Sequence, residues 1–124
     1  MTLLAYHLAL DAQPEIGDNT LLAAALGVDV ERVFALVGQG GRLPELVGIE
    51  EFIGRVRKTV GREPLVFAHG PERIERVTIC SALGIHFVAG GHDATERLGV
   101  QALSQRLAER FDLEWESLPV ENPV

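Results

Sequence analysis

An amphipathic helix pattern in the middle of the chain, flanked by strand-like segments, most constrains the fold. From Ile49 to Val60 the apolar residues recur every three or four positions, which is the spacing of a helix with one buried face. Apolar, β-branched segments precede and follow this pattern, over Val30–Val37 and Pro64–Ala68. Strands that alternate with helices predict a layered architecture. We therefore expect an α/β fold, a mixed sandwich in which helices pack on a sheet.

The rest of the chain is expected to follow the same alternation. The cluster Gly38–Gly41 is predicted to be a loop or hairpin, because it has the spacing of neither a P-loop nor a dinucleotide-binding motif. Asp18 or Asn19 is expected to cap the helix that ends at Gly27. Further strands are expected over Leu3–Leu10, Arg73–Cys80, Gly84–Ala89 and Leu113–Leu118. Helices are expected over Leu21–Leu26 and Asp93–Arg110, the second with a buried stripe of Val100, Leu103, Leu107 and Phe111.

Length and charge limit the classes of protein that fit. The 124 residues suffice for one domain with its own core, and we expect residues 1–124 to form a single α/β domain. A net charge of −7 offers no basic surface for nucleic acid or an anionic membrane. The longest apolar run, Leu21–Leu26, is too short to cross a bilayer, and the N-terminus lacks the basic segment of a signal peptide. We therefore expect a cytoplasmic protein with no nucleic-acid and no membrane partner. Its only cysteine, Cys80, is expected to be a small buried hydrophobe.

His7 and Asp11 are the first pair that could carry chemistry. On the expected strand they would point to the same face, so the imidazole and the carboxylate would share one side of the sheet. The alternative is a core histidine beside an aspartate that belongs to the turn before Pro14. The sequence pattern leaves both open.

His92 and Glu96 are the second pair. A spacing of four places both on one face of the first turn of the expected helix, within reach of a common divalent ion. The alternative is a capping box over Asp93–Glu96, in which the Glu96 side chain returns to the first amide of the helix. His69 and His86 have no carboxylate partner nearby in the sequence and are expected to be structural.

Two motifs near the ends of the chain resemble one known family. The first is His7–Asn19, and the second is Gly91–Arg97, which continues into Gly99–Leu103 and the terminal Glu121–Val124. In this order, and over essentially the whole chain, they resemble the dinuclear-metal-centre family. Its members are called GTP cyclohydrolase 1 type 2 homologues or NGG-interacting-factor-three-like proteins.

The resemblance implies a metal site and identifies its ligands. Asp11, His92 and Glu96 fall on metal-contacting positions of the family, and His7 falls near them. The implied cofactor is a divalent ion, Zn, Mn or Fe. The resemblance also implies a homo-oligomer and a small phosphorylated or nucleotide ligand.

Two parts of the family pattern are missing from this chain. An adjacent His-His pair, expected before Met1, is absent, and a helix–strand unit is missing where Cys80-Ser81 runs into Ala82–Gly84. The chain therefore corresponds to a reduced second half of the family. The three remaining ligands suit one ion better than two, because each cation needs its own ligands and two cations repel.

The resemblance therefore implies a metal-binding protein, and a metal-dependent hydrolase with a mononuclear site if it is active. The family name alone suggests GTP cyclohydrolase chemistry, and it assigns no catalytic residue. One alternative is a non-catalytic interaction or structural domain that has lost the metals. Another is one half of a split protein.

Overall fold

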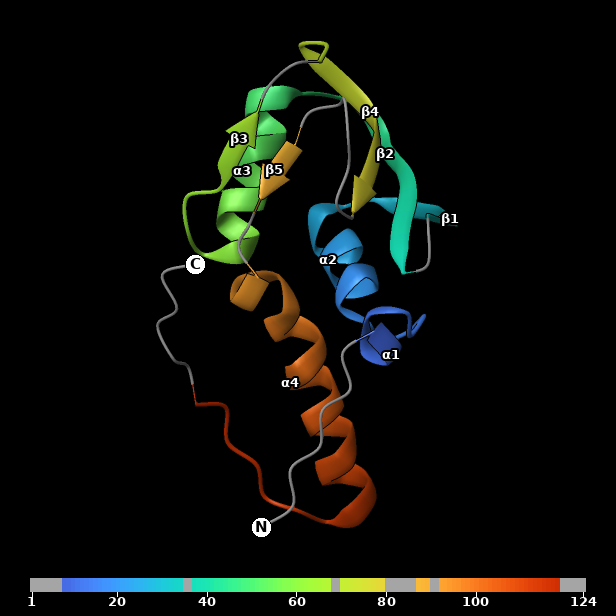
Figure 1. Ribbon diagram of the computed structural model, residues 1–124, viewed down its shortest axis with the longest axis vertical. Coiled ribbons are helices and arrows are strands. Elements are labelled where there is room, and N and C mark those ends of the chain that lie inside the picture. The colour runs from blue at the N-terminus through green and yellow to red at the C-terminus, as the bar shows by residue number, and fades with distance from the viewer. Residues whose placement is uncertain (1–7, 35–36, 68–69, 80–86, 90–91, 119–124) are drawn as a thin grey trace.

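The computed structural model describes residues 8–34, 37–67, 70–79, 87–89 and 92–118. Its helices are α1 (Leu8–Asp11), α2 (Asp18–Leu26), α3 (Ile49–Val60) and α4 (His92–Phe111). Its strands are β1 (Asp29–Phe34), β2 (Gly38–Gly48), β3 (Leu65–Phe67), β4 (Arg73–Ile79) and β5 (Phe87–Ala89). The predicted mixed α/β fold is confirmed, and Figure 1 shows its arrangement.

Antiparallel pairing joins the described strands into two sheets. The larger has the order β1-β2-β4, and the smaller pairs β3 with β5. Strand β2 is central, and its pairing with β4 shifts between Arg42 and Val47. Pro44 lies in this interval and has no N–H to donate, which accounts for the irregularity.

Helix α3 begins and ends where the sequence predicts. Its buried side chains are Phe52, Ile53, Val56 and Val60. Gly61 follows at φ 71°, a left-handed conformation that glycine adopts without strain, and its N–H donates to the Arg57 carbonyl at 3.0 Å.

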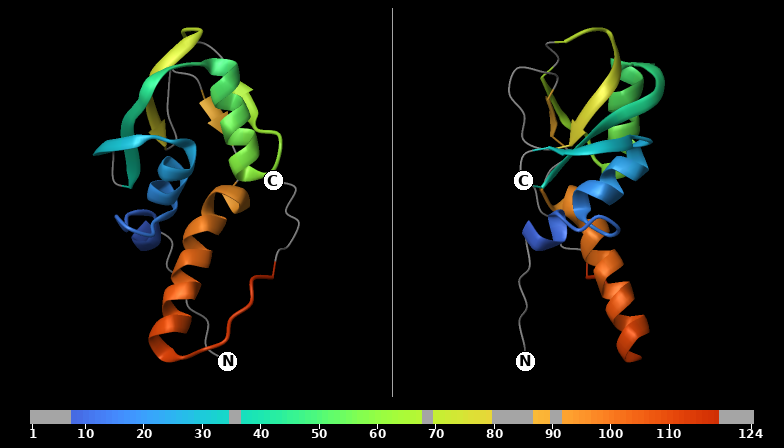
Figure 2. Two further views of the ribbon diagram at one scale, coloured as in Figure 1. Left: turned by 180° about the vertical axis from the view of Figure 1, so that it is seen from behind. Right: turned by 90° about the vertical axis from the view of Figure 1, so that its right-hand side faces the viewer.

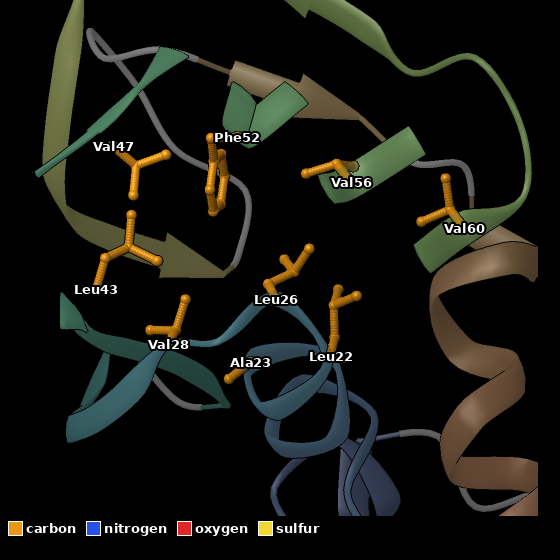
Figure 3. Close-up of a cluster of buried hydrophobic side chains, with 9 residues drawn as sticks. All are labelled: Leu22, Ala23, Leu26, Val28, Leu43, Val47, Phe52, Val56 and Val60. Atoms are coloured by element: carbon orange, nitrogen blue, oxygen red, sulfur yellow. The ribbon is translucent and has the colours of Figure 1, made fainter. Parts of the chain in front are cut away.

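The core lies between α2, α3 and the second half of β2. Side chains from these elements point toward one another in Figure 3, and Leu43 and Val47 of β2 are 2% exposed. Ile74 and Val77 of β4 pack against the edge of this cluster. Its buried members are Leu22, Ala23, Leu26, Val28, Leu43, Val47, Phe52, Val56 and Val60.

Helix α4 packs against the core with its first turns, through Ala94 and Leu98. Its C-terminal part extends beyond the other elements, as Figure 2 shows. The predicted buried stripe is wrong for three of its four members, since Val100, Leu107 and Phe111 are 54%, 41% and 62% exposed, whereas Leu103 is half-buried. The spacing identifies one apolar face, but most of that face stays exposed in this part of the helix.

Two local predictions are wrong, and a third is correct in one of its alternatives. Within the predicted strand Leu3–Leu10, the described residues from Leu8 onward belong to helix α1, because a short apolar run does not distinguish a strand from a buried helix. Of the loop or hairpin predicted for Gly38–Gly41, the hairpin is correct, since these residues form the buried start of β2, which pairs antiparallel with the preceding strand β1. Residues 113–118 form no strand, because no described strand lies beside them to supply hydrogen bonds.

Residues 3–7, Cys80 and 84–86, on which other predictions rest, lie outside the described residues. Within the part of the chain that the structure describes, none of the helices has the length and apolar character needed to span a membrane.

Candidate metal site

A tight turn joins α1 to α2 and brings the last residue of α1 close to the first residue of α2. Gln13 holds this turn, since its N–H donates to the Leu10 carbonyl at 3.1 Å. Its side-chain Oε1 accepts hydrogen bonds from the N–H groups of Glu15 at 2.7 Å and Ile16 at 2.6 Å. The Gly17 N–H then donates to the Gln13 carbonyl at 2.9 Å.

Gly17 is required at the end of this turn for steric reasons. A Cβ atom there would lie 2.6 Å from the Leu10 carbonyl oxygen and 2.9 Å from that of Asp11. Gly17 is also the N-cap of α2, and no side chain caps the helix. The prediction that Asp18 or Asn19 caps α2 is therefore wrong. Asp18 is instead the first residue of the helix, and its side chain is buried.

Asp18 joins three helices through its carboxyl group. Its Oδ1 accepts a hydrogen bond from the Gly99 N–H of α4 at 2.9 Å, and its side chain is also hydrogen-bonded to Asp11 of α1. Both acids are almost fully buried, at 6% exposure for Asp18 and 8% for Asp11.

The surroundings raise the pKa of Asp18 from 3.8 to about 6. Burial is the largest cause, because it disfavours the charged form. The bond from Gly99 opposes this effect, while Asp11 and, more weakly, Glu96 raise the pKa further through their negative charge. The carboxylates of Asp11 in α1 and Glu96 in α4 therefore lie close enough to act on Asp18 of α2.

Of the three predicted ligands, Asp11 and Glu96 thus lie near a common buried carboxyl group. Asp11 is the last residue of α1, so the prediction that it shares a strand face with His7 is wrong. Glu96 is half-buried on α4. His92 is the first residue of α4, one helical turn before Glu96, and its side chain lies outside the described residues, as does that of Asp93.

The donor types suit a divalent ion, and the excess of negative charge favours a cation. Among the described side chains, no three His, Cys, Asp or Glu residues are arranged as a ready metal-binding group. A metal site here would therefore need a ligand from outside the described side chains, and His92 is the one that the sequence predicts. The other three histidines, at positions 7, 69 and 86, lie outside the described part of the chain.

The sequence alone does not indicate that Asp18 belongs to this site. Its position directly after Gly17 indicates a helix start, and aspartate there is usually a solvated cap. Burial by a helix that lies far along the chain leaves no local signal. An open hollow of about 850 Å³ lies at the other end of α4, lined by residues from Gln105 to Glu116, and it includes none of the predicted ligands.

The fold and these residues define a class: a mixed α/β protein in which three helices bring carboxyl groups together, those of Asp11 and Asp18 buried and that of Glu96 half-buried. Residues 1–84 match the family described as Duf34/NIF3 (NGG1p interacting factor 3). The chain belongs to this family, which confirms the resemblance inferred from its sequence.

Curated relatives extend the match to the whole chain. A GTP cyclohydrolase 1 type 2 homolog of Pseudomonas aeruginosa is 34% identical, and one of Escherichia coli K12 is 32% identical. Each match includes all of this chain, which spans only 64% of the relative's length. The first match runs over 164 positions, against 124 residues here, so the relative carries residues within the matched span that this chain lacks.

Two solved structures share the fold. One, described as protein ybgI of unknown function, has a TM-score of 0.85 at 32% identity. The match covers 96% of this chain and 62% of the ybgI chain. The other, TTHA1606 from Thermus thermophilus, has a TM-score of 0.79 at 27% identity. The match covers 95% of this chain and 60% of the TTHA1606 chain.

Proposed function

We propose that this protein binds a single divalent metal ion through Asp11, His92 and Glu96, and that it is a metal-dependent hydrolase of the Duf34/NIF3 family. The observation that carries the proposal is the gathering of Asp11 and Glu96, from opposite ends of the chain, around the buried carboxyl of Asp18. The position of His92 one helical turn before Glu96 supports it further, because residues four apart share a helix face.

Each residue has a role in this proposal. Asp11 would supply a carboxylate from α1, and the His92 imidazole and the Glu96 carboxylate would come from the first turns of α4. A divalent ion held there would lower the pKa of water and so supply a nucleophile at neutral pH. The names of the relatives indicate a nucleotide, and a small phosphorylated molecule or nucleotide is the substrate class to test.

Metal content per chain, measured by elemental analysis on untagged protein purified without chelator, tests the site. We expect about one equivalent of Zn, Mn or Fe, as a ligand set of one imidazole and two carboxylates allows. Asp11→Asn and the double variant His92→Ala, Glu96→Ala should each lose the ion. Glu109→Ala is the matched control, because Glu109 is an exposed glutamate on the same helix.

Unchanged metal content in the double variant would overturn the ligand assignment. Absence of metal from the wild-type protein, even after Mn²⁺ or Zn²⁺ is added, would favour a non-catalytic domain. If the wild-type protein binds metal, hydrolysis of nucleotides and phosphoesters should depend on Asp11.

A further inference from the structure

Asp18 occupies the position between the two helices that carry the proposed carboxylate ligands. It belongs to α2, yet its side chain bonds to Asp11 of α1 and to the Gly99 N–H of α4. The second bond joins residues 81 positions apart and is buried. A single carboxyl group therefore fixes α1 and α4 relative to each other at the point where the ligands lie.

The contact with α4 is closely fitted. A Cβ atom at position 99 would lie 2.2 Å from Oδ1 of Asp18 and 2.7 Å from its Cγ, so only glycine allows this approach. Gly99 comes three residues after Glu96, and residues three apart are neighbours on a helix surface. Whatever fixes Gly99 therefore also fixes the turn of α4 that carries Glu96.

A second connection between the same parts of the molecule is much weaker. Arg106 of α4 forms an ion pair with Glu15 of the α1–α2 turn at 2.7 Å, and both side chains are exposed. Exposed pairs typically contribute between about 0 and 1 kcal/mol. Of these two polar connections, the buried contact of Asp18 with Gly99 is therefore the stronger one.

We propose that Asp18 is a positioning residue of the metal site, which orients the Asp11 carboxylate and fixes the Glu96 turn of α4 without itself binding the ion. The inference rests on the metal site proposed above. Hydrogen-bonding partners behind metal ligands hold the ligands in their binding orientation, and their removal typically weakens metal affinity about 10- to 100-fold.

Two conservative substitutions separate geometry from charge. Asp18→Asn keeps the shape and both hydrogen bonds, since its Oδ1 accepts from Gly99 and its Nδ2 donates to Asp11. Asp18→Glu keeps the carboxylate but is longer by one methylene, which the close contact with Gly99 does not accommodate. Asn19→Ala is the matched control, because it removes a part-buried hydrogen bond of the next residue, to the Val37 carbonyl at 2.8 Å, away from the ligands.

The experiment is calorimetric titration of the metal-free full chain with Mn²⁺ at neutral pH, with the electron paramagnetic resonance spectrum of the bound Mn²⁺ as a second readout. We expect Asp18→Asn to bind within about threefold of the wild-type affinity, with an unchanged spectrum. Asp18→Glu should bind at least about 10-fold more weakly, with an altered spectrum. Asn19→Ala should match the wild-type protein in both readouts, although its melting temperature falls.

The outcomes separate this inference from the proposed function. Equal loss in Asp18→Asn and Asp18→Glu, or wild-type affinity in Asp18→Glu, would overturn the positioning role and leave the metal site intact. Loss in Asn19→Ala of the same size as in Asp18→Glu would also overturn it, because the effect would then be general destabilisation. No Mn²⁺ binding by the folded wild-type protein would overturn the metal site itself, and this inference with it.

Discussion

Asp18 is an ionisable side chain that is almost fully removed from solvent, and this has a consequence for stability. Its pKa is about 6 in the folded chain, raised mainly by burial, and near 3.8 when solvated. Between these two pH values the unfolded chain releases the proton and the folded chain keeps it. The free energy of unfolding therefore falls as pH rises from about 4 through about 6, and stays lower above that range.

Asp18→Asn should remove this part of the pH dependence, because the amide imitates the protonated acid. In metal-free protein with chelator present, we expect the variant to melt at the same temperature as wild type near about pH 4. Above about pH 7 it should melt several degrees higher. Asp11 and Glu96 face residue 18 in both proteins, so the difference between the two melting curves isolates this position. A difference that is constant with pH would contradict the raised pKa.

Gly41 and Gly54 form a contrasting pair of glycines. A Cβ atom on Gly41 of β2 would lie 2.2 Å from the Asp29 carbonyl oxygen of β1, whereas one on Gly54 of α3 meets nothing within 4 Å. Gly41→Ala should therefore lower the free energy of unfolding by about 1–3 kcal/mol, through overpacking. Gly54→Ala should raise it by about 0.5–1 kcal/mol, through helix propensity. Urea denaturation measures both, and equal effects would argue against the packing of β1 on β2 described above.

The residues of the candidate site were predictable to different extents. Asp11, His92 and Glu96 belong to local sequence motifs. The spacing of four between His92 and Glu96 can be recognised wherever a helix is expected. Asp18 was not predictable as a member, because its burial comes from a glycine 81 residues away. No propensity or spacing rule reports a contact over that separation. The sequence therefore predicts candidate ligands more readily than the groups that orient them.

The helices and strands also differ in whether their bounds can be predicted from the local sequence. The bounds of α3 are local, since its apolar spacing and the glycine at each end are all contained in the segment. The bounds of β2 are not determined locally, because Gly38–Gly41 is a strand only through its pairing with β1 and β4. The alternation over 113–118 is strand-like, yet Trp115 uses its Nε1 to donate to Gln105 of α4 at 3.0 Å. A strand requires a neighbouring strand, which local sequence does not specify.

Substitutions in α3 and at the C-terminal end of α4 should have very different effects on the free energy of unfolding. Phe52 of α3 is 6% exposed within the core, and Phe111 of α4 is 62% exposed. Phe52→Ala should lower the free energy of unfolding by about 3–5 kcal/mol, because it removes buried apolar area and leaves a cavity. Phe111→Ala should change it by no more than about 0.5 kcal/mol. Urea unfolding curves of the two variants, recorded at chain concentrations at which the protein is monomeric, test this, and a large loss for Phe111→Ala would mean that another part of the same chain covers Phe111.

At the scale of the whole molecule, apolar side chains collect on the outer part of α4 and the segment after it. Leu107, Phe111, Leu113 and Trp115 are each at least 41% exposed, and Leu118 is 76% exposed. Contiguous apolar surface on a folded chain usually marks an interface, because contact with water is unfavourable over its whole area. We therefore expect this face to be covered by a second copy of the chain.

The oligomeric state tests this expectation in solution. Light scattering coupled to size exclusion should give the wild-type protein a mass of more than one chain. The double variant Leu107→Glu, Phe111→Glu should be monomeric, because it places two carboxylates on the apolar face without touching the core. Lys58→Glu changes the net charge by the same amount on the exposed side of α3 and should leave the mass unchanged. A monomeric wild-type protein, or dissociation by Lys58→Glu, would show that this face is not the interface. If the expectation holds, the two halves of α4 have different roles. Its C-terminal half contacts a neighbouring chain, and its first turns contribute to the cluster of carboxylates around Asp18.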